Sequence, residues 1–313
     1  MLPFILRRLG AGIVLLFAIT TITYVMLYFS SKNIAHNILG EFATPEQIAA
    51  KQAELGLDQP LFARYADWLG GALTGDLGRS WFNSEPVLQA LSSRLPVTLS
   101  IVVTALLVAT LLAAALGIAA AVKRGWIDRA VQFFSLAADA LPSFVIAIIL
   151  VTVLAIGLGL FPATGYVAFG SNPSLWLASI TLPVLALIFQ LTASSAQQFR
   201  SAIIEVRRRD YVRTLRSRGL GEREVLVKHV LRSAAPPALT ILSLQFIGLL
   251  GGSVIVEQIF ALPGIGPLAI ASTTKGDIPV VMGIVVYTVI MVIIVNLIVD
   301  LVNGWLNPKV RVS

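Results

Sequence analysis

Three carboxylates lie within or beside long apolar stretches of this sequence, where an ionisable side chain is unusual. Asp139 stands in the middle of one stretch, three residues before Pro142, whereas Glu257 and Asp300 stand near the ends of two others. An ionisable group inside a membrane is energetically expensive and marks an ion pathway, a proton relay or a ligand site by default. Asp139 is therefore the first candidate. Glu257 and Asp300 are close enough to water to be ordinary end residues.

Neutral polar residues extend this set. Gln190, Gln245 and Ser253 also stand in apolar stretches, where such side chains either line a pathway or form hydrogen bonds between helices. Gly248 and Gly252 are one helical turn apart and predict a close contact between two helices. The candidate pathway residues are Asp139, Gln190, Gln245 and Ser253.

Motifs for covalent chemistry and for nucleotide hydrolysis are absent from the sequence. The dipeptide Gly-Lys never occurs, which excludes a phosphate-binding P-loop. The chain has no cysteine and only two histidines, His36 and His229, so it has no thiol site and no His-Glu-x-x-His zinc site. No motif supports Asp139 and Asp300 as a proteolytic pair. We expect no catalytic residue, no metal and no cofactor in this chain.

The composition is that of a polytopic membrane protein. Of 313 residues, 57% are hydrophobic and 12% charged, with a mean hydropathy of +0.87, whereas soluble domains carry about 25% charged residues. The net charge of +7 fits basic loops on the inner face of a membrane. No pattern of base-stacking or groove-reading residues indicates nucleic-acid binding. A channel, a carrier or a transport subunit is the simplest class that remains.

Six apolar stretches reach the roughly 20 residues that a membrane-spanning helix needs. They predict an all-α fold with spans at about 9–29, 97–122, 131–158, 175–196, 237–256 and 280–303. The first stretch is longer than a signal-peptide core and lacks a small-residue cleavage site, so we interpret it as a retained anchor. Pro142 and Pro183 are expected to kink the third and fourth spans.

The basic residues of the short loops orient these spans. Lys123, Arg124 and Arg129 lie between spans two and three, whereas residues 159–174 contain no Lys or Arg. Because basic loops stay in the cytoplasm, both termini are predicted to be cytoplasmic. The long segment 30–96 is then external, and Thr44-Pro45-Glu46 predicts a helix from Pro45 to about Leu55 within it. Trp68, Trp81 and Phe82 are expected at the level of the lipid headgroups.

The segment 197–235, between spans four and five, is the most charged part of the chain. Ten Lys or Arg residues lie between Ala196 and Ala235. Each costs about 2.5–3.5 kcal/mol at a bilayer centre, so the segment must be a cytoplasmic loop. Asp210 to Gly219 reads as a short helix that Asp210 caps and Gly219 stops. Glu222 to Ala234 reads as a second helix. We favour a protein-docking knob over an amphipathic hairpin on anionic lipid.

This loop resembles the signature loop of the permease subunits of bacterial ABC importers, in which Glu-Ala-Ala, three residues and a glycine precede a second helix. Here Arg213-Thr214-Leu215 replaces Glu-Ala-Ala, and Gly219 is kept. Asp-Tyr-Val-Arg-Thr at residues 210–214 resembles the dipeptide/oligopeptide/nickel branch. Further similar segments lie along nearly the whole chain, among them Leu55-Gly56-Leu57-Asp58-Gln59-Pro60, Glu257-Gln258-Ile259-Phe260 and Pro263-Gly264-Ile265-Gly266.

The resemblance implies a permease for peptides in the bacterial cytoplasmic membrane. Its partners would be a second homologous permease, two ABC ATPases that hold ATP and Mg, and an extracytoplasmic substrate-binding protein. The resemblance implies one transmembrane domain over 1–313, with an external segment 30–96, a core 97–303 and a coupling loop 197–235. The ATPase-coupling residues would be Tyr211, Arg213, Thr214, Leu215, Arg216, Gly219 and Glu222. Phe260, Pro263 and Gly264 would contact the binding protein.

Two alternatives stay open. The same importer class also carries nickel chelates and glutathione, and the sequence does not distinguish these cargoes. A different class, an autonomous channel or ion-coupled carrier, would use Asp139 as its charged site.

Overall fold

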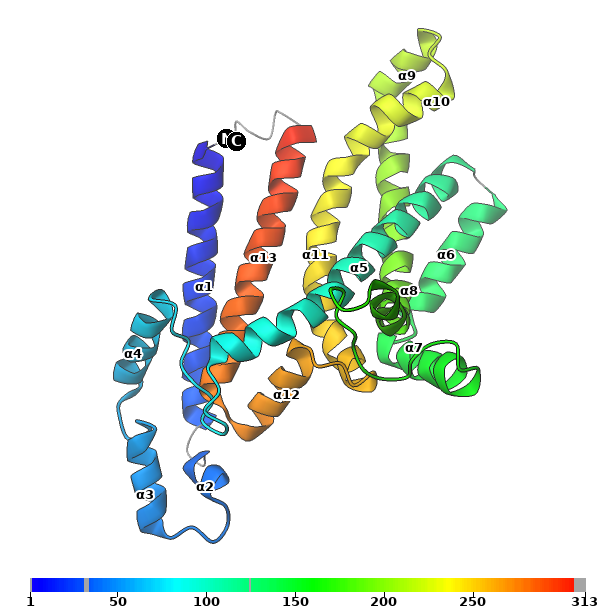
Figure 1. Ribbon diagram of the computed structural model, residues 1–313. Helices are drawn as coiled ribbons and strands as arrows, with labels where there is room; N and C mark the ends of the chain where they lie inside the picture. The colour runs from blue at the N-terminus through cyan, green and yellow to red at the C-terminus, as the bar shows by residue number, and fades with distance from the viewer. Residues whose placement is uncertain (1, 31–33, 124, 307–313) are drawn as a thin grey trace. The chain divides into compact units, whose positions relative to one another are not determined.

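The computed structural model describes residues 2–30, 34–123 and 125–306, and these form helices with no β-strand (Figure 1). Five helices are long and apolar enough to span a membrane, and a bent helix pair can supply a sixth span. This confirms the predicted all-α polytopic fold. The five are α1 (Leu2–Ser30), α5 (Val87–Val122), α8 (Pro173–Arg207), the continuous helix Glu222–Ile259, and α13 (Ile278–Leu306).

The third predicted span is not one kinked helix. It consists of α6 (Trp126–Asp139), α7 (Ser143–Leu150) and a π-helical end, η2 (Val151–Gly157), with a bend of 91° between α6 and α7. Pro142 is the N-cap of α7, at φ −59° and ψ 143°, so its backbone is extended where a continuous helix was expected. Proline has no N–H to donate and disfavours helix in the preceding residue, which explains a complete break.

The helix that leads into the fifth span begins earlier than predicted. We expected a separate cytoplasmic helix ending at Ala234. Instead α10 (Glu222–Glu224), the π-helix η3 (Val225–Val230) and α11 (Leu231–Ile259) run on without a break, and Pro236 and Pro237 lie inside α11. Residues 231–235 of α11 lie between the end of η3 at Val230 and Pro236, and the helix continues through both prolines.

The chain divides into two compact units. The first comprises residues 1–4, 99–262 and 294–313, and the second comprises 5–98 and 263–293. In the first unit, α8 packs against α6, α7 and α11. It also approaches α5 at Gly117, where a Cβ would lie 2.6 Å from the Cβ of Phe199 and 2.9 Å from the carbonyl oxygen of Ala196. Only glycine permits that approach without a shift of one helix.

Four short helices belong to the second unit: α2 (Ile34–Leu39), α3 (Pro45–Glu54), α4 (Leu61–Leu73) and α12 (Ile265–Lys275). The predicted start of α3 is confirmed, because Thr44 accepts a hydrogen bond from the Gln47 backbone and the Gln47 side chain accepts one from Thr44 N–H at 3.0 Å. The other three helices were not predicted.

Trp68 and Trp81 of the second unit are partly buried within the chain. Both pack against a buried cluster of Tyr24, Ile34, Ile278 and Met282. Beside this cluster, Ser80 Oγ and the Trp81 N–H (3.2 Å) both donate to the carboxylate of Asp277. The segment before α5 is thereby fixed to the turn between α12 and α13. Burial raises the pKa of Asp277 above its ordinary value, and the bonds from Ser80 and Trp81 partly oppose that rise.

Candidate functional site

The first candidate site is the short helix α9 (Asp210–Ser217), which lies with α10 at one end of α8 and α11 (Figure 1). Its predicted stop at Gly219 is confirmed. Gly219 has φ +83°, its N–H donates to Arg216 O at 2.9 Å, and the Leu220 N–H donates to Leu215 O at 3.3 Å. This pair of bonds is a Schellman motif, which satisfies the last helical carbonyls and needs a left-handed residue at its centre.

The predicted N-cap of this helix is wrong by one residue. Arg209 occupies the cap position without a side-chain bond, and Asp210 stands in the first turn. The Asp210 carboxylate is 98% exposed and lies 4.0 Å from Arg213. It therefore favours the helix through the macrodipole and a weak i,i+3 charge pair, not through capping.

The inner face of α9 is bound to a hydrophobic cluster of the first unit. Val212 of α9 is fully buried, and Leu215 and Leu220 pack against the same cluster. Its buried members are Ala121, Ile203, Val206, Val212, Val225, Val230 and Ala234, which come from α5, α8, α9, η3 and α11. Because four other helical elements contribute, a displacement of α9 would have to disturb the ends of both neighbouring spans.

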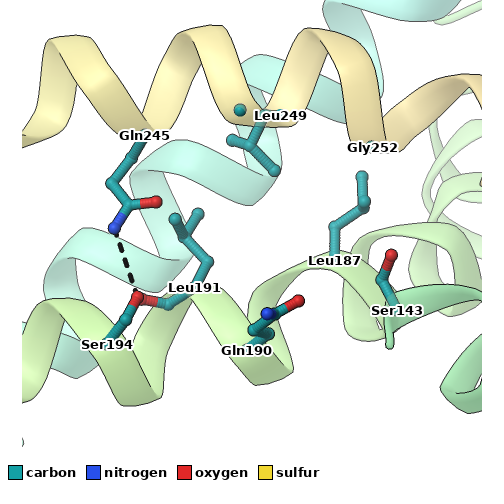
Figure 2. Close-up of a pocket in the computed structure, with 9 residues that line it drawn as sticks. Ser143, Leu187, Gln190, Leu191, Ser194, Gln245, Leu249 and Gly252 are labelled. Carbon is teal, nitrogen blue, oxygen red and sulfur yellow. Dashed lines mark hydrogen bonds between the residues drawn. The ribbon is translucent and has the colours of Figure 1, made fainter. Parts of the chain in front are cut away.

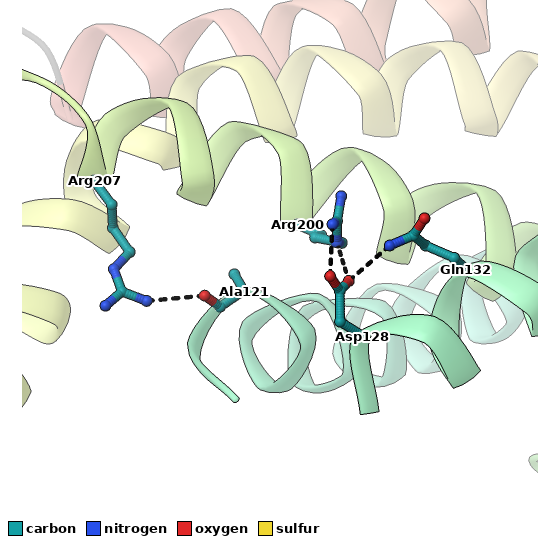
Figure 3. Close-up of polar contacts among 5 residues, drawn as sticks. All are labelled: Ala121, Asp128, Gln132, Arg200 and Arg207. Carbon is teal, nitrogen blue, oxygen red and sulfur yellow. Dashed lines mark hydrogen bonds and ion pairs between the residues drawn. The ribbon is translucent and has the colours of Figure 1, made fainter. Parts of the chain in front are cut away.

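Polar contacts fix the same helix from the sides. Arg216 Nε lies 2.6 Å from Glu222 Oε1, across the glycine turn, and Arg207 Nη2 lies 3.5 Å from the other Glu222 oxygen. Arg207 also donates to the backbone oxygen of Ala121 at 2.8 Å (Figure 3). The Tyr211 hydroxyl donates to Ser233 Oγ at 3.0 Å. Of the predicted coupling residues, Tyr211, Leu215, Arg216, Gly219 and Glu222 thus position α9 within this chain.

The outer face of α9 is exposed. Arg213, Thr214, Ser217 and Arg218 all point to solvent, and the Arg213 side chain is 76% exposed. This face presents two arginines and two hydroxyl side chains on a firmly held helix. A basic surface of this kind suits an acidic groove on another protein.

A further pair in the first unit was not predicted from sequence. Arg200 of α8 forms a two-point ion pair with Asp128 of α6, with Nη2 at 2.8 Å from Oδ2, and Gln132 donates to Asp128 at 3.0 Å (Figure 3). Asp128 is the one carboxylate in the basic loop after span two. A single acidic residue among basic ones was the sequence feature that could have predicted an ion pair here. The pair fixes the first turn of α6 against α8.

The second candidate site is a cavity of about 260 Å³ between α7, α8 and α11 (Figure 2). It brings together Gln190 and Gln245, which were both predicted to line a pathway. Gln245 Nε2 donates to Ser194 Oγ at 3.2 Å. The lining residues are Ser143, Leu187, Gln190, Leu191, Ser194, Gln245, Gly248, Leu249 and Gly252. These neutral amides and hydroxyls can donate to and accept from an uncharged polar chain, and none of them carries a charge.

Among residues 2–30, 34–123 and 125–306, Gly248 and Gly252 of α11 do not form the expected close helix contact. A Cβ at Gly248 would meet no atom within 4 Å, and one at Gly252 would only touch Leu187 at 4.0 Å. Both residues instead line the cavity. Small side chains here widen the space beside Gln245.

Of the other two predicted pathway residues, Ser253 does not line this cavity. Ser253 is buried, and its hydroxyl donates to Leu250 O of the same helix at 3.2 Å. Asp139 ends α6 at the bend and not in the middle of a helix. Its side chain lies outside the described residues.

The third predicted site is the loop after α11, and its three predicted residues differ in solvent exposure. Phe260 is 1% exposed, and its carbonyl accepts a hydrogen bond from Gly165 N–H at 3.0 Å in the first unit. In the second unit, Gly264 is buried and Pro263 is exposed. Of the three, only Pro263 presents a side chain for an external partner.

Comparisons with known proteins cover nearly the whole chain. Residues 110–312 match the family described as binding-protein-dependent transport system inner membrane component, and residues 1–102 match the N-terminal family of the same membrane components. A putative peptide transport system permease protein of Brucella abortus is 36% identical over 99% of both chains. The dipeptide transport system permease protein DppB of Lactococcus lactis is 35% identical, over 99% of this chain and 100% of that protein.

Two more relatives bear on the cargo and on the fold. The glutathione transport system permease protein GsiC of Escherichia coli is 33% identical over 99% of both chains. The inward-facing structure of the MetNI methionine ABC transporter contains a chain with a TM-score of 0.57 and 16% identity, over 72% of this chain and 99% of that one. At that identity the likeness concerns the fold.

Proposed function

The chain belongs to the family of binding-protein-dependent transport system inner membrane components, and we propose that it is the permease subunit of an ATP-driven importer of peptides. Relatives named as peptide and dipeptide permeases, 36% and 35% identical over their full length, support the cargo. The glutathione permease relative supports a small peptide-like solute as the alternative within the same class.

One observation carries the mechanism: α9 is firmly held on its inner face and exposed on its outer face. A chain without a P-loop must receive the energy of ATP from partners. We propose that two ABC ATPases hold ATP and Mg, and that one of them receives α9 in a groove. Because the cluster under Val212 joins α5, α8, η3 and α11, movement of α9 would be passed to the spans as a rigid displacement.

The cavity between α7, α8 and α11 is proposed as part of the peptide path. Gln190, Gln245 and Ser194 offer the donors and acceptors that a peptide backbone requires, without a fixed charge that would select one side chain. The small residues Gly248 and Gly252 leave room for a second, homologous permease to complete the path. Pro263 is the proposed external contact with a substrate-binding protein.

We further propose that residues 1–313 form one transmembrane domain of a multi-pass protein of the bacterial cytoplasmic membrane. Within it, 30–96 would be the external segment, 97–303 the core and 197–235 the coupling loop. The helices α5 and α13 each run through both compact units, which supports a single domain. With cytoplasmic termini, α9 and the basic residues of 197–235 face the ATPases.

Reconstitution into proteoliposomes tests this function. The complete complex with its binding protein should take up a labelled dipeptide only with ATP, while the chain without ATPases should not. A panel of dipeptides, longer peptides, glutathione and a nickel chelate assigns the cargo. Uptake by the chain alone would favour the autonomous carrier and reject the importer.

A further inference from the structure

The ion pair between Asp128 of α6 and Arg200 of α8 connects two parts of the first unit that have different proposed roles. Along α8, Arg200 stands between Ser194, which lines the cavity, and Ile203, which belongs to the cluster under α9. The two charged side chains are largely buried, with exposed fractions of 18% and 20%. Both oxygens of Asp128 accept from the guanidinium, and Gln132 adds a third bond (Figure 3). A partly buried two-point pair is stronger than an ordinary surface ion pair.

Beyond this pair, one face of α6 stays bound to α8. Val131 and Ala196 belong to the same buried cluster, and Ser135 Oγ donates to the backbone oxygen of Ala193 at 2.8 Å in a buried position. Positions 128, 131 and 135 share one face of a helix and extend over about two turns. A displacement of this part of α8 must therefore carry α6 with it.

The far end of α6 leads to the cavity. The chain breaks at Pro142, where the backbone is extended, and α7 begins at a bend of 91° to α6. Ser143, the first residue of α7, lines the cavity together with Gln190 of α8 and Gln245 of α11 (Figure 2). Hinge motion is absorbed by a few residues at the ends of helices, and the break before Ser143 is such a place.

The packing of α7 itself is sparse. Ala147 is the one buried residue of this helix among the residues that the structure describes. The helix packs against α8 and α11, but most of its side chains are exposed or half-buried. The position of this cavity wall therefore depends on α6, to which α7 is joined through the break.

We propose that Asp128 and Arg200 are positioning residues of the transport cycle. Their pair makes α6 follow α8 when α9 is displaced, so that the α7 wall of the cavity moves with the α8 and α11 walls. Arg200 stands three residues before Ile203, less than one helical turn from the cluster under α9. The proposal rests on the proposed docking of α9 on an ATPase.

Peptide uptake and ATP hydrolysis, measured together in proteoliposomes with the complete complex and its binding protein, test the proposal. Asp128→Asn removes the charge at nearly constant volume, and ATP hydrolysis should continue because α9 and its cluster are unchanged. The ratio of transported peptide to hydrolysed ATP should fall by about fivefold or more, since a hydrogen bond to a charged group is worth at least that factor in an equilibrium. Glu224→Gln is the matched control and should keep the wild-type ratio, because Glu224 pairs with Lys228 four residues further along the same continuous helix.

Exchange of the two charges separates the pair from its surroundings. Asp128→Arg alone and Arg200→Asp alone each place like charges together and should lower the ratio further, whereas the double exchange should raise it back towards the wild type. Arg200→Lys keeps the charge but loses the planar fork, so it should lower the ratio less than Asp128→Asn does. This milder variant decides the question if Asp128→Asn does not assemble.

A thiol at the cavity wall gives a readout that requires no uptake. The chain has no native cysteine, so Ser143→Cys carries the only thiol. Its maleimide labelling rate in the complete complex should differ between ADP and ATP with vanadate, and the addition of Asp128→Asn should remove most of that difference.

Three results would overturn the proposal: a normal transport ratio in Asp128→Asn, a lowered ratio that the double exchange does not raise, or a nucleotide-dependent labelling change that Asp128→Asn leaves intact. A wild-type complex without ATP-dependent uptake would instead contradict the proposed function. In that case the labelling of Ser143→Cys still decides the role of the pair.

Discussion

Arg216 and Glu222 form an ion pair across the turn that separates α9 from α10, with 2.6 Å between Nε and Oε1. The pair closes over Gly219, whose positive φ lets the chain reverse there. Arg207 reaches the same carboxylate from α8. Glu222 thus connects α8, α9 and α10 by charge, whereas the family resemblance implied that it contacts the ATPase.

Glu222→Gln is expected to loosen α9 and to lower uptake per ATP hydrolysed. Exposed ion pairs contribute about 0.2–1 kcal/mol, so the effect should be at most about fivefold and the complex should still assemble. Glu224→Gln is the matched control, because Glu224 pairs with Lys228 of its own helix at 2.7 Å and not with α9. Uptake and ATP hydrolysis measured together in proteoliposomes check this. Equal losses in both variants would refute a specific role of Glu222.

Gly219→Ala is expected to uncouple hydrolysis from uptake more strongly. A side chain in the left-handed region costs about 1–2 kcal/mol, and the Schellman bonds at residues 219 and 220 must shift to relieve it. Gly221→Ala is the control, since Gly221 has φ −65° and open space around its Cα. The ratio of transported peptide to hydrolysed ATP distinguishes them. A normal ratio in Gly219→Ala would show that the turn is not needed for coupling.

The parts of the fold that depend on local signals could be predicted from the sequence. Thr44-Pro45 started α3 as expected, and Gly219 stopped α9 as expected, because capping involves only neighbouring backbone groups. Five of the six apolar stretches likewise predicted a continuous helix long enough to span a membrane, because the thickness of the bilayer sets the length that such a stretch needs. The sixth corresponds to the bent pair of α6 and α7.

The remaining parts depend on contacts between distant residues. Pro142 and the pair Pro236–Pro237 all stand in or beside apolar stretches that predict helix. The helix nevertheless breaks at Pro142, whereas α11 continues through Pro236 and Pro237. The Gly248 and Gly252 pair predicted a close helix contact, but among the described residues only Leu187 reaches the pair, at 4.0 Å from a Cβ built on Gly252. The Arg200–Asp128 pair spans 72 positions, and no local pattern pairs those two residues.

Replacing Gln190 or Gln245 by Leu is expected to reduce peptide uptake through a higher KM. The loss of one hydrogen bond is worth about 1 kcal/mol, which corresponds to about fivefold in affinity. Gln245→Leu also removes the bond to Ser194. Ser253→Ala serves as control, because that hydroxyl bonds within its own helix and does not line the cavity. Unchanged KM in both glutamine variants would exclude this cavity from the path.

Asp277 predicts a pH-dependent stability of the second unit. Its pKa is raised by burial in the folded chain, so the fold holds the proton more tightly than the unfolded chain does. The resulting stabilisation is complete below the ordinary aspartate pKa and is lost as the pH rises through the raised value. Asp277→Asn cannot titrate. The difference in Tm between wild type and variant should therefore change as the pH rises from the ordinary aspartate pKa through the raised pKa of Asp277. A difference that stays constant with pH would contradict a raised pKa at Asp277.

The central claim is that the exposed face of α9 docks on an ATPase, and a single thiol tests it most directly. The chain has no native cysteine, so Thr214→Cys carries the only one, and Glu46→Cys on the exposed face of α3 is the control. Maleimide labelling is measured in detergent with and without the ATPase subunits. The account predicts that ATPase binding protects Thr214→Cys and leaves Glu46→Cys fully reactive. Equal labelling of Thr214→Cys in both preparations would contradict it.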